Sequence, residues 1–244
     1  MSRDDYDRLW RTTWGDLQRI GPVHRHIQED LLRLTARLGV RTILDVGCGS
    51  GENLAALARS GRYELAGTDL SEEALAIARR RTSAARLFPL DIETDTLDDL
   101  DERFDLVMSI QVVEHLRDDT AALANMARMS RRYVFISTMA GTMRPSEARI
   151  GHVRNYAPGE LEAKLEAAGV TVRWSRGWGF PFYSPAYRTI VEWLPSGPPG
   201  GTVGRIGPIG RIAAAALYQL YRLNRPGRGD VLSVLGEVAP DPGR

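Results

Sequence analysis

The chain has 244 residues, 43% of them hydrophobic, which is long enough for one domain with a full core and short for two. Its 32 basic and 31 acidic residues leave a net charge of +1. This balance excludes a global field of the kind that attracts nucleic acid, so no nucleic-acid partner is expected.

The N-terminus, Met1 to Asp5, is charged and leads into no apolar stretch, and no run of 18 apolar residues could span a bilayer. The sequence therefore predicts a cytoplasmic protein without a transmembrane segment. Its single cysteine, Cys48, excludes an internal disulfide and a cysteine-based zinc site.

Residues 1–39 predict a helical N-terminal cap. Leu31, Leu34 and Leu38 recur near helical spacing in a pattern over residues 5–38, which Gly21-Pro22 interrupts. Residues 40–244 are predicted to form the main domain, and an insertion over residues 181–229 is expected before the last strand.

Strand-like and helical patterns alternate after the cap. Apolar runs predict strands at residues 42–46, 63–68, 85–89, 104–110, 133–138, 170–175 and 230–238. Helical patterns lie between most of them, at residues 53–60, 71–83, 120–130 and 158–168. This order predicts a Rossmann-like, doubly wound α/β fold with a mostly parallel sheet. Ligands of such sheets bind at the carboxyl ends of the strands.

The first predicted strand ends in the glycine turn Gly47-Cys48-Gly49-Ser50-Gly51. Gly47 and Gly49 permit positive φ and remove side chains where a ligand must approach the backbone, and Gly51 lets the helix begin close to the strand. Asp45 stands two residues before the first glycine. This carboxylate favours a cationic cofactor such as S-adenosylmethionine over a pyrophosphate.

Two further acids follow the next two strands. Asp69, about 20 residues after the glycines, is placed to accept the ribose hydroxyls. Asp91 is placed to accept from an adenine amino group, with Leu70 and Ile92 packed on the ring faces. The alternatives are that Asp91 belongs to a solvated acidic run and that the glycines serve only a tight turn.

The ordered segments LDVGCGSG, GTDLS, PLD and FDLVMSIQVVEHL resemble the class I S-adenosylmethionine-dependent methyltransferases, in the branch of the ubiquinone-biosynthesis O-methyltransferases. The resemblance covers roughly residues 40–175. It implies a seven-stranded sheet with an antiparallel last strand and S-adenosylmethionine as cofactor. It also implies a role for each of the following residues: Asp45, Gly47, Gly49 and Gly51, with Cys48 in the same turn, at the methionine end; Asp69 at the ribose; Asp91 and Ile92 at the adenine; and Ile110 and Gln111 beside the methyl group.

Methyl transfer is an in-line displacement that needs a base only if the acceptor must lose a proton. Glu114 and His115 follow the fourth strand, beside the expected methyl group, and histidine is the usual base at neutral pH. In the alternative interpretation these two residues only cap or anchor the next helix.

The loop after the fifth strand carries His152, Arg154 and Tyr156. Similar loops in the family lie over the acceptor pocket, which implies that these residues hold or deprotonate the substrate, with His152 favoured as the base. The alternatives are that Arg154 pairs with surface acids and that Tyr156 packs beneath the following helix.

Some quinone-pathway relatives carry E-x-x-E-H after the fourth strand and bind a divalent metal through it. Here Gln111 stands in the first acidic position. A neutral amide is a poorer ligand for a hard cation than a carboxylate, so no metal is expected.

Two residues of the cap are further cofactor candidates. Trp14 could lie over the cofactor with its aromatic face near the sulfonium, and Arg25 could bind the cofactor carboxylate in a bidentate manner. Core packing and a surface salt bridge are the respective alternatives.

Aromatic residues, including Phe182 and Tyr183, lead into the predicted insertion over residues 181–229. Because long connections are usually functional or disordered, the insertion is interpreted as a lid that binds an apolar or aromatic acceptor. A Pro- and Gly-rich stretch over residues 194–210 precedes a helix at residues 209–223. The alternatives are a homodimer contact in place of a monomer, or a peripheral membrane contact beside a lipid-linked acceptor.

The sequence thus predicts an S-adenosylmethionine-dependent methyltransferase that methylates an oxygen, or else a nitrogen or carbon, of a small apolar or aromatic metabolite. The alternatives are a nucleotide-sugar, glycan or lipid-linked acceptor, and a nonenzymatic partner protein that binds an adenosyl cofactor. A nicotinamide enzyme is supported by the glycines alone.

Overall fold

The computed structural model describes residues 3–12, 14, 17–95, 103–193 and 207–239. Within them one seven-stranded sheet has the strand order β3-β2-β1-β4-β5-β7-β6. Its strands are β1 (Thr42–Val46), β2 (Glu64–Asp69), β3 (Ala85–Pro89), β4 (Phe104–Ile110), β5 (Ser130–Met139), β6 (Val170–Trp178) and β7 (Val231–Val238). Strand β7 is antiparallel to both β5 and β6, and β1 to β5 pair in parallel. The predicted fold class and the antiparallel last strand are confirmed.

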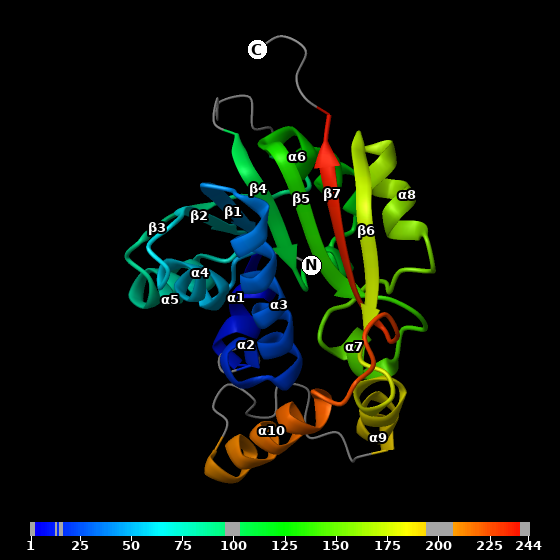
Figure 1. The fold of residues 1–244 in the computed structure, drawn as a ribbon. Helices are drawn as coiled ribbons and strands as arrows, with labels where there is room; N and C mark the ends of the chain where they lie inside the picture. Colours follow the sequence, from blue (N-terminus) through cyan, green and yellow to red (C-terminus); the bar gives the residue numbers. More distant parts are fainter. Residues whose placement is uncertain (1–2, 13, 15–16, 96–102, 194–206, 240–244) are drawn as a thin grey trace.

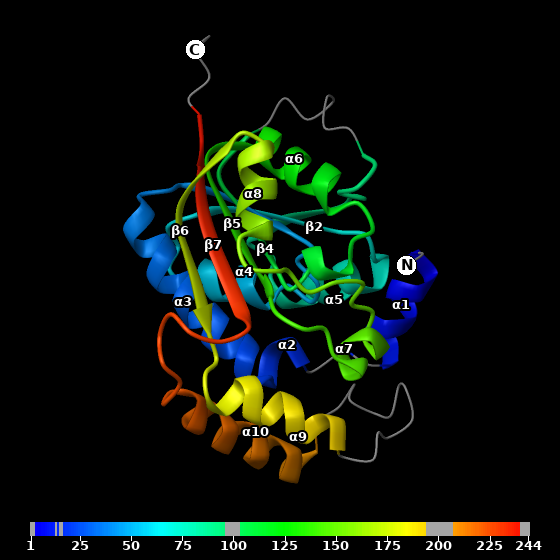
Figure 2. The same ribbon diagram turned by 90° about the vertical axis from the view of Figure 1, so that its right-hand side faces the viewer.

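Helices cover both faces of this sheet (Figures 1 and 2). They are α1 (Arg3–Thr12), α2 (Leu17–Ile20), α3 (Pro22–Leu38), α4 (Glu52–Ala58), α5 (Glu72–Arg81), the 3₁₀ helix η1 (Val113–His115), α6 (Asp119–Met129), α7 (Pro145–Arg149), α8 (Glu160–Ala167), the irregular turn η2 (Phe182–Tyr187), α9 (Arg188–Trp193) and α10 (Pro208–Tyr221). The alternation predicted from the sequence is therefore present, with η1, α7, η2 and α9 as additions.

The central strands are buried on both faces, so apolar residues stand next to one another along them. Ile43 of β1 packs into a core with α3, α4 and α5, whereas its neighbour Leu44 packs into a second core with α6 and α8. The signals that begin the helices are also local. The Ser71 hydroxyl, for example, accepts from Ala74 N at the start of α5. We conclude that the elements near the sheet centre follow from short-range sequence signals.

The strand order reverses at β1, which pairs with β2 on one side and β4 on the other. Connections from the two strands leave in opposite directions, which opens a crevice at their carboxyl ends. The glycine turn that follows β1 begins in this crevice.

The predicted cap over residues 1–39 folds as α1, α2 and α3, with Gly21 as the residue before α3. No comparison tests the boundary at residue 39, so the division into cap and main domain stays a prediction. Strands β5 and β6 are longer than predicted, since β5 begins at Ser130 and β6 continues to Trp178.

The predicted insertion contains η2, α9 and α10, and residues 194–206 of its Pro- and Gly-rich stretch lie outside the described residues. Both views place α9 and α10 beyond the carboxyl ends of the parallel strands (Figures 1 and 2). Trp193 and Ile209 are 84% and 85% exposed. Among the described helices none is long and apolar enough to cross a membrane.

Two glycines before β7 provide a matched test of backbone packing. A Cβ on Gly229 would lie 2.3 Å from the carbonyl oxygen of Trp178, whereas a Cβ on Gly227 would meet nothing within 4 Å, and both residues have positive φ. We expect Gly227→Ala to lower the free energy of unfolding by about 1 kcal/mol and Gly229→Ala to lower it by about 3 kcal/mol or more. Urea unfolding measures both, and equal losses would contradict the expectation.

Candidate active site

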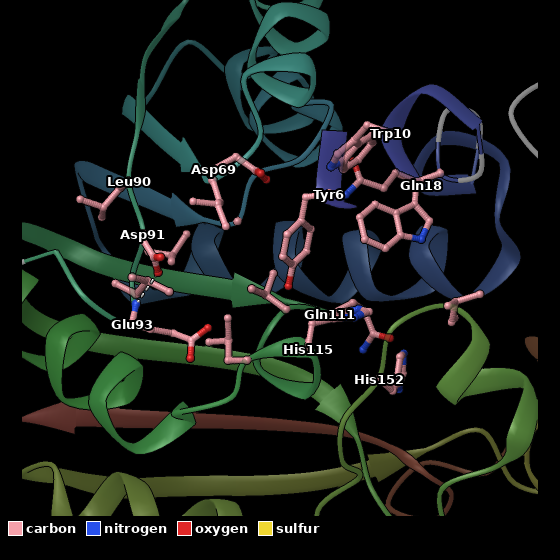
Figure 3. Close-up of a pocket in the computed structure, with 18 of the residues that line it drawn as sticks. Tyr6, Trp10, Gln18, Asp69, Leu90, Asp91, Glu93, Gln111, His115 and His152 are labelled. Carbon is pink, nitrogen blue, oxygen red and sulfur yellow. Dashed lines mark hydrogen bonds between the residues drawn. The ribbon is translucent and has the colours of Figure 1, made fainter. Parts of the chain in front are cut away.

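A pocket opens at the carboxyl ends of β1 to β4 beneath the N-terminal helices (Figure 3). Asp69 and Asp91 lie on one side of it, and Gln111, His115 and His152 gather on the other. The ring of Tyr6, from α1, lies between the two sides. The pocket thus joins the predicted nucleoside residues to the predicted catalytic histidines.

The glycine turn forms the floor at Gly47, which has a φ of 72° and lines the pocket. A Cβ there would lie 2.5 Å from a methyl carbon of Val112. The Gly47 and Cys48 amides both donate to the carbonyl oxygen of Thr68, at 2.7 and 2.8 Å, which ties the turn to β2. The bare backbone at Gly47 is therefore required by the packing of the pocket wall itself.

The other members of the turn lie behind this floor. The Cys48 side chain is buried in the core with α3, α4 and α5. Gly51 precedes α4, but its nearest neighbour is Ala78 of α5, 3.0 Å from an added Cβ. The absence of a side chain at Gly51 therefore lets α4 pack close to α5, and its expected role between helix and strand stays a prediction.

Asp45 is buried under the turn, and its Oδ2 has no hydrogen-bond partner among the described residues. Burial raises the pKa of this carboxyl well above its ordinary value, and nearby Asp69 raises it further. An unpaired buried carboxylate beside bare backbone fits a ligand that carries a cationic group. S-adenosylmethionine carries both an ammonium and a sulfonium, so these residues fit it.

Asp69 ends β2 and faces the pocket. Its Oδ2 accepts from Gly49 N and its Oδ1 from Ser71 N, both at 2.9 Å. Burial raises the pKa of this carboxyl to about 6, while the backbone donors oppose the shift. The two amides hold the carboxylate in a fixed orientation at the edge of the pocket.

Asp91, Leu70 and Ile92 line the same side of the pocket as Asp69. The Asp91 carboxylate accepts from Glu93 N at 3.0 Å, so it closes a short turn after β3. The structure therefore brings together the four residues that the sequence placed around the nucleoside.

The N-terminal helices form the roof of the pocket through Tyr6, Trp10, Trp14 and Gln18. The Trp14 ring lies 5.5 Å from that of Trp10 and 5.7 Å from that of His115. The Gln18 Oε1 accepts from the Ser50 amide and hydroxyl, at 3.1 and 2.8 Å. Sequence reasoning placed Trp14 here but missed Gln18, because one polar residue in a helical pattern gives no signal.

Glu114, His115 and His152 form a buried cluster in which one ligand atom from each lies within 4.8 Å of the others. Glu114 and His115 come from η1, and His152 comes from the loop after α7. The Thr138 hydroxyl donates to Glu114 Oε2 at 2.7 Å. Glu114 Oε1 and His115 Nδ1 are buried and have no hydrogen-bond partner among the described residues.

Burial shifts the pKa values of Glu114 and His115 in opposite directions. It raises the pKa of Glu114, although His152 and the Thr138 hydroxyl act against this. Burial also lowers the pKa of His115 to about 3, and nearby His152 adds to that effect. His115 is therefore neutral at physiological pH and a weak base.

One carboxylate and two imidazoles are also a donor set that first-row divalent metals accept. The expectation of no metal rested on Gln111, which lines the pocket with an unpartnered Nε2. It did not foresee that His152 would approach from another segment. Because the same groups suit proton transfer, the absence of a metal stays a prediction.

The structure does not bring Arg25, Arg154 or Tyr156 into the pocket. The Arg25 guanidinium carbon lies 3.8 Å from the centre of the Tyr218 ring. Arg154 donates to the carbonyl oxygens of Leu116 and Arg117, and the fully buried Tyr156 hydroxyl donates to Asp119 at 2.7 Å. Tyr156 packs with Leu161 of the following helix, as its alternative expected, whereas Arg154 binds backbone carbonyl oxygens and not the surface acids that its alternative named.

Three further candidates also lie outside the pocket. Phe182 and Tyr183 belong to η2, where the Tyr183 ring lies 5.6 Å from that of Tyr221 and 6.1 Å from that of Tyr187. Ile110 is buried in the core, one residue before the pocket-lining Gln111. Aromatic crowding before α9 therefore reflects packing within the insertion.

Comparisons with known proteins agree with this arrangement. A family model described as a methyltransferase domain matches residues 43–132. The chain is 25% identical over 214 residues to a ubiquinone biosynthesis O-methyltransferase from Hydrogenovibrio crunogenus, covering 76% of this chain and 86% of that protein. Further relatives with that name are 28–32% identical, over 53–60% of this chain and 59–66% of their own length.

Solved structures show the same fold at low identity. The cyclase SpnF superposes with a TM-score of 0.67 at 16% identity, covering 98% of this chain and 97% of its own. Magnesium protoporphyrin IX methyltransferase from Synechocystis PCC 6803, solved with bound S-adenosylhomocysteine, has a TM-score of 0.61 at 14% identity and covers 97% and 98%. The strand order, the glycine turn and the methyltransferase-domain match over residues 43–132 together support a class I S-adenosylmethionine-dependent methyltransferase.

Proposed function

We propose that this enzyme transfers the methyl group of S-adenosylmethionine to a hydroxyl oxygen of a small aromatic or apolar metabolite. The observation that carries the proposal is the buried cluster of Glu114, His115 and His152, whose two histidines line the pocket on the side opposite Asp69. A hydroxyl acceptor must lose a proton, and this cluster offers a base where the acceptor would lie. The named O-methyltransferase relatives support the same acceptor atom.

The cofactor is proposed to lie along the glycine turn. Asp69 would accept the ribose hydroxyls, and Asp91, Leu70 and Ile92 would surround the adenine. The methionine end would lie toward Gly47 and the unpaired carboxylate of Asp45. Trp14 would cover the sulfonium side, where an aromatic face favours a cation.

When bound, the cofactor supplies an electrophilic methyl carbon on its sulfonium sulfur. His152 would accept the hydroxyl proton, so that the acceptor oxygen could take the methyl group from the bound cofactor and leave S-adenosylhomocysteine and a methyl ether. Glu114 stabilises the resulting imidazolium, because its carboxylate lies in the same buried cluster. His115 stays neutral and contributes a hydrogen bond.

A panel of catechols, phenols and hydroquinones tests this function, with S-adenosylhomocysteine release as the measurement. The corresponding fully methylated ethers are the matched controls, since they keep the ring but offer no hydroxyl. We expect release with at least one hydroxylated compound and none with its ether. Methyl label recovered only on nitrogen or carbon would contradict the proposal.

A lipid-linked acceptor is the second candidate, and the exposed apolar side chains of α9 and α10 favour it. Ile190 and Trp193 on α9 and Ile209 and Ile212 on α10 are all exposed. These exposed side chains could instead form a homodimer contact. Faster turnover of a polyprenylated phenol in anionic vesicles than in detergent would support the membrane alternative, and sedimentation would detect the dimer.

Methyl transfer is expected to need no added metal, because proton transfer to His152 requires none. Dialysis against EDTA should leave the rate of S-adenosylhomocysteine release unchanged, and Mg²⁺ or Zn²⁺ should not raise it. Metal analysis of the purified protein provides a readout independent of turnover. Loss of the rate on chelation, restored by one cation, would show instead that Glu114, His115 and His152 hold a metal.

A further inference from the structure

A chain of polar contacts, buried except at the half-buried Asn155, runs from α9 in the insertion to His152 in the pocket. It consists of Arg188, Glu147, Asn155 and His152, which come from α9, α7 and the loop between α7 and α8. Apart from His152, no member of it was foreseen from the sequence. Its last contact places the Asn155 amide oxygen beside a ring nitrogen of His152.

Arg188 begins this chain. Its side chain is almost fully buried, and its Nε and Nη2 contact Glu147 Oε1 at 2.8 and 2.6 Å. Nη1 pairs with Asp230 before β7, and Nη2 also donates to the carbonyl oxygen of Thr142 at 3.1 Å. A guanidinium held on three sides has one orientation, so Arg188 fixes the position of the Glu147 carboxylate.

Both oxygens of the Glu147 carboxylate already accept from donors, so an acceptor oxygen beside this carboxylate would be repelled. Arg188 occupies Oε1, while Oε2 accepts from Arg144 N and Asn155 Nδ2, both at 2.9 Å. If the Asn155 amide were turned over, its carbonyl oxygen would face this anion. The amide is therefore held with its nitrogen toward Glu147 and its oxygen toward His152.

Asn155 Oδ1 lies 3.4 Å from His152 Nδ1. An amide oxygen can only accept, so the ring nitrogen beside it must carry the hydrogen. In a neutral imidazole, the proton on Nδ1 leaves Nε2 with a free lone pair. The His152 amide also donates to the carbonyl oxygen of Glu147 at 3.1 Å, which holds the ring's backbone to the same helix.

We propose that Arg188, Glu147 and Asn155 are positioning residues that keep His152 in its Nδ1-protonated form, with Nε2 as the basic nitrogen. The inference rests on the proposed function in taking His152 as the base. It gives the insertion a role besides covering the acceptor: α9 supplies the arginine on which the orientation of the base depends.

The test reads the ring tautomer directly. The chain has only four histidines, so long-range ¹H–¹⁵N spectra of the ¹⁵N-labelled protein with S-adenosylhomocysteine resolve each ring, and His152→Asn assigns the His152 signals. We expect the wild type to show His152 protonated at Nδ1. A wild-type ring protonated at Nε2 would overturn the proposal.

Variants then separate positioning from folding. Asn155→Leu keeps the side-chain size but removes the acceptor, so His152 should populate both tautomers and kcat should fall about tenfold or more, with little change in the KM of S-adenosylmethionine. Arg188→Met should produce the same mixture of tautomers. Arg188→Lys should restore part of the Nδ1-protonated population. An unchanged His152 tautomer in folded Asn155→Leu protein would also overturn the proposal.

Arg222→Met is the matched control, because Arg222 is an exposed arginine at the end of α10 in the same insertion. It should leave both the tautomer and kcat unchanged. The spectra also separate this inference from the proposed function. If His152 is protonated at Nδ1 while His152→Ala keeps full turnover, the proposed base is wrong and the tautomer assignment stands.

Discussion

Replacement of His152 by alanine is expected to lower kcat toward a hydroxylated acceptor by about 100- to 10,000-fold, the usual contribution of a general base. His152 lines the pocket, and Glu114 lies close enough to stabilise its protonated form. The affinity for S-adenosylhomocysteine should change little, because the proposed nucleoside residues lie on the other side of the pocket. Steady-state kinetics and calorimetry measure the two quantities.

Two histidine variants complete this experiment. His115→Ala should have a smaller effect on kcat, since burial already lowers the pKa of His115 to about 3 and makes it a weak base. His26→Ala removes a histidine that stacks on Tyr218 outside the pocket, and it should keep wild-type turnover. If His152→Ala and His115→Ala both retain full turnover, neither residue is the base.

Asp69→Asn is expected to raise the dissociation constant of S-adenosylhomocysteine about 10- to 100-fold. The variant has one acceptor oxygen where the wild type has two, and its amide nitrogen must face either Gly49 N or Ser71 N. The substitution therefore weakens both the contact with the ribose and the hydrogen bonds that hold the glycine turn. Asp30→Asn, on the exposed side of α3, is the control and should bind as the wild type does. Equal dissociation constants for all three proteins would contradict the ribose assignment.

The same carboxylate predicts a pH dependence of binding. Burial raises the pKa of Asp69 to about 6, so the free protein takes up a proton here as the pH falls through 6. A protonated carboxyl accepts the ribose hydroxyls poorly, and affinity should weaken below pH 6 and level off above it. Calorimetry between pH 5 and 8 should show this in the wild type and a much flatter profile in Asp69→Asn. A wild-type profile as flat as that of the variant would contradict the expectation.

The sheet and the nucleoside side of the pocket could be predicted because their signals are local. Ile43 and Leu44 are neighbours in an apolar strand, and Asp69 directly follows the strand that positions it. Each such residue is located by the element it ends, so one stretch of sequence is enough. The topology then brings the strand ends together without further information.

The acceptor side could be predicted only in part, because its contacts join distant segments. Arg188 meets Glu147 across 41 residues, and no local pattern announces such a pair. Arg154 and His152 share one loop, yet only His152 faces the pocket, since Arg154 turns to backbone carbonyls after η1. Sequence spacing therefore identified the loop but not the side chain that enters the site.

The position of β7 between β5 and β6 has a consequence for the order of folding. Strands β1 to β5 pair among themselves in parallel, but β6 has no partner in the sheet except β7. During synthesis, the cofactor half can therefore assemble while β6 and the insertion wait for the last strand to emerge. Asp230, which anchors Arg188, arrives with that strand. A nascent chain released before β7 would then carry a cofactor crevice without an oriented base.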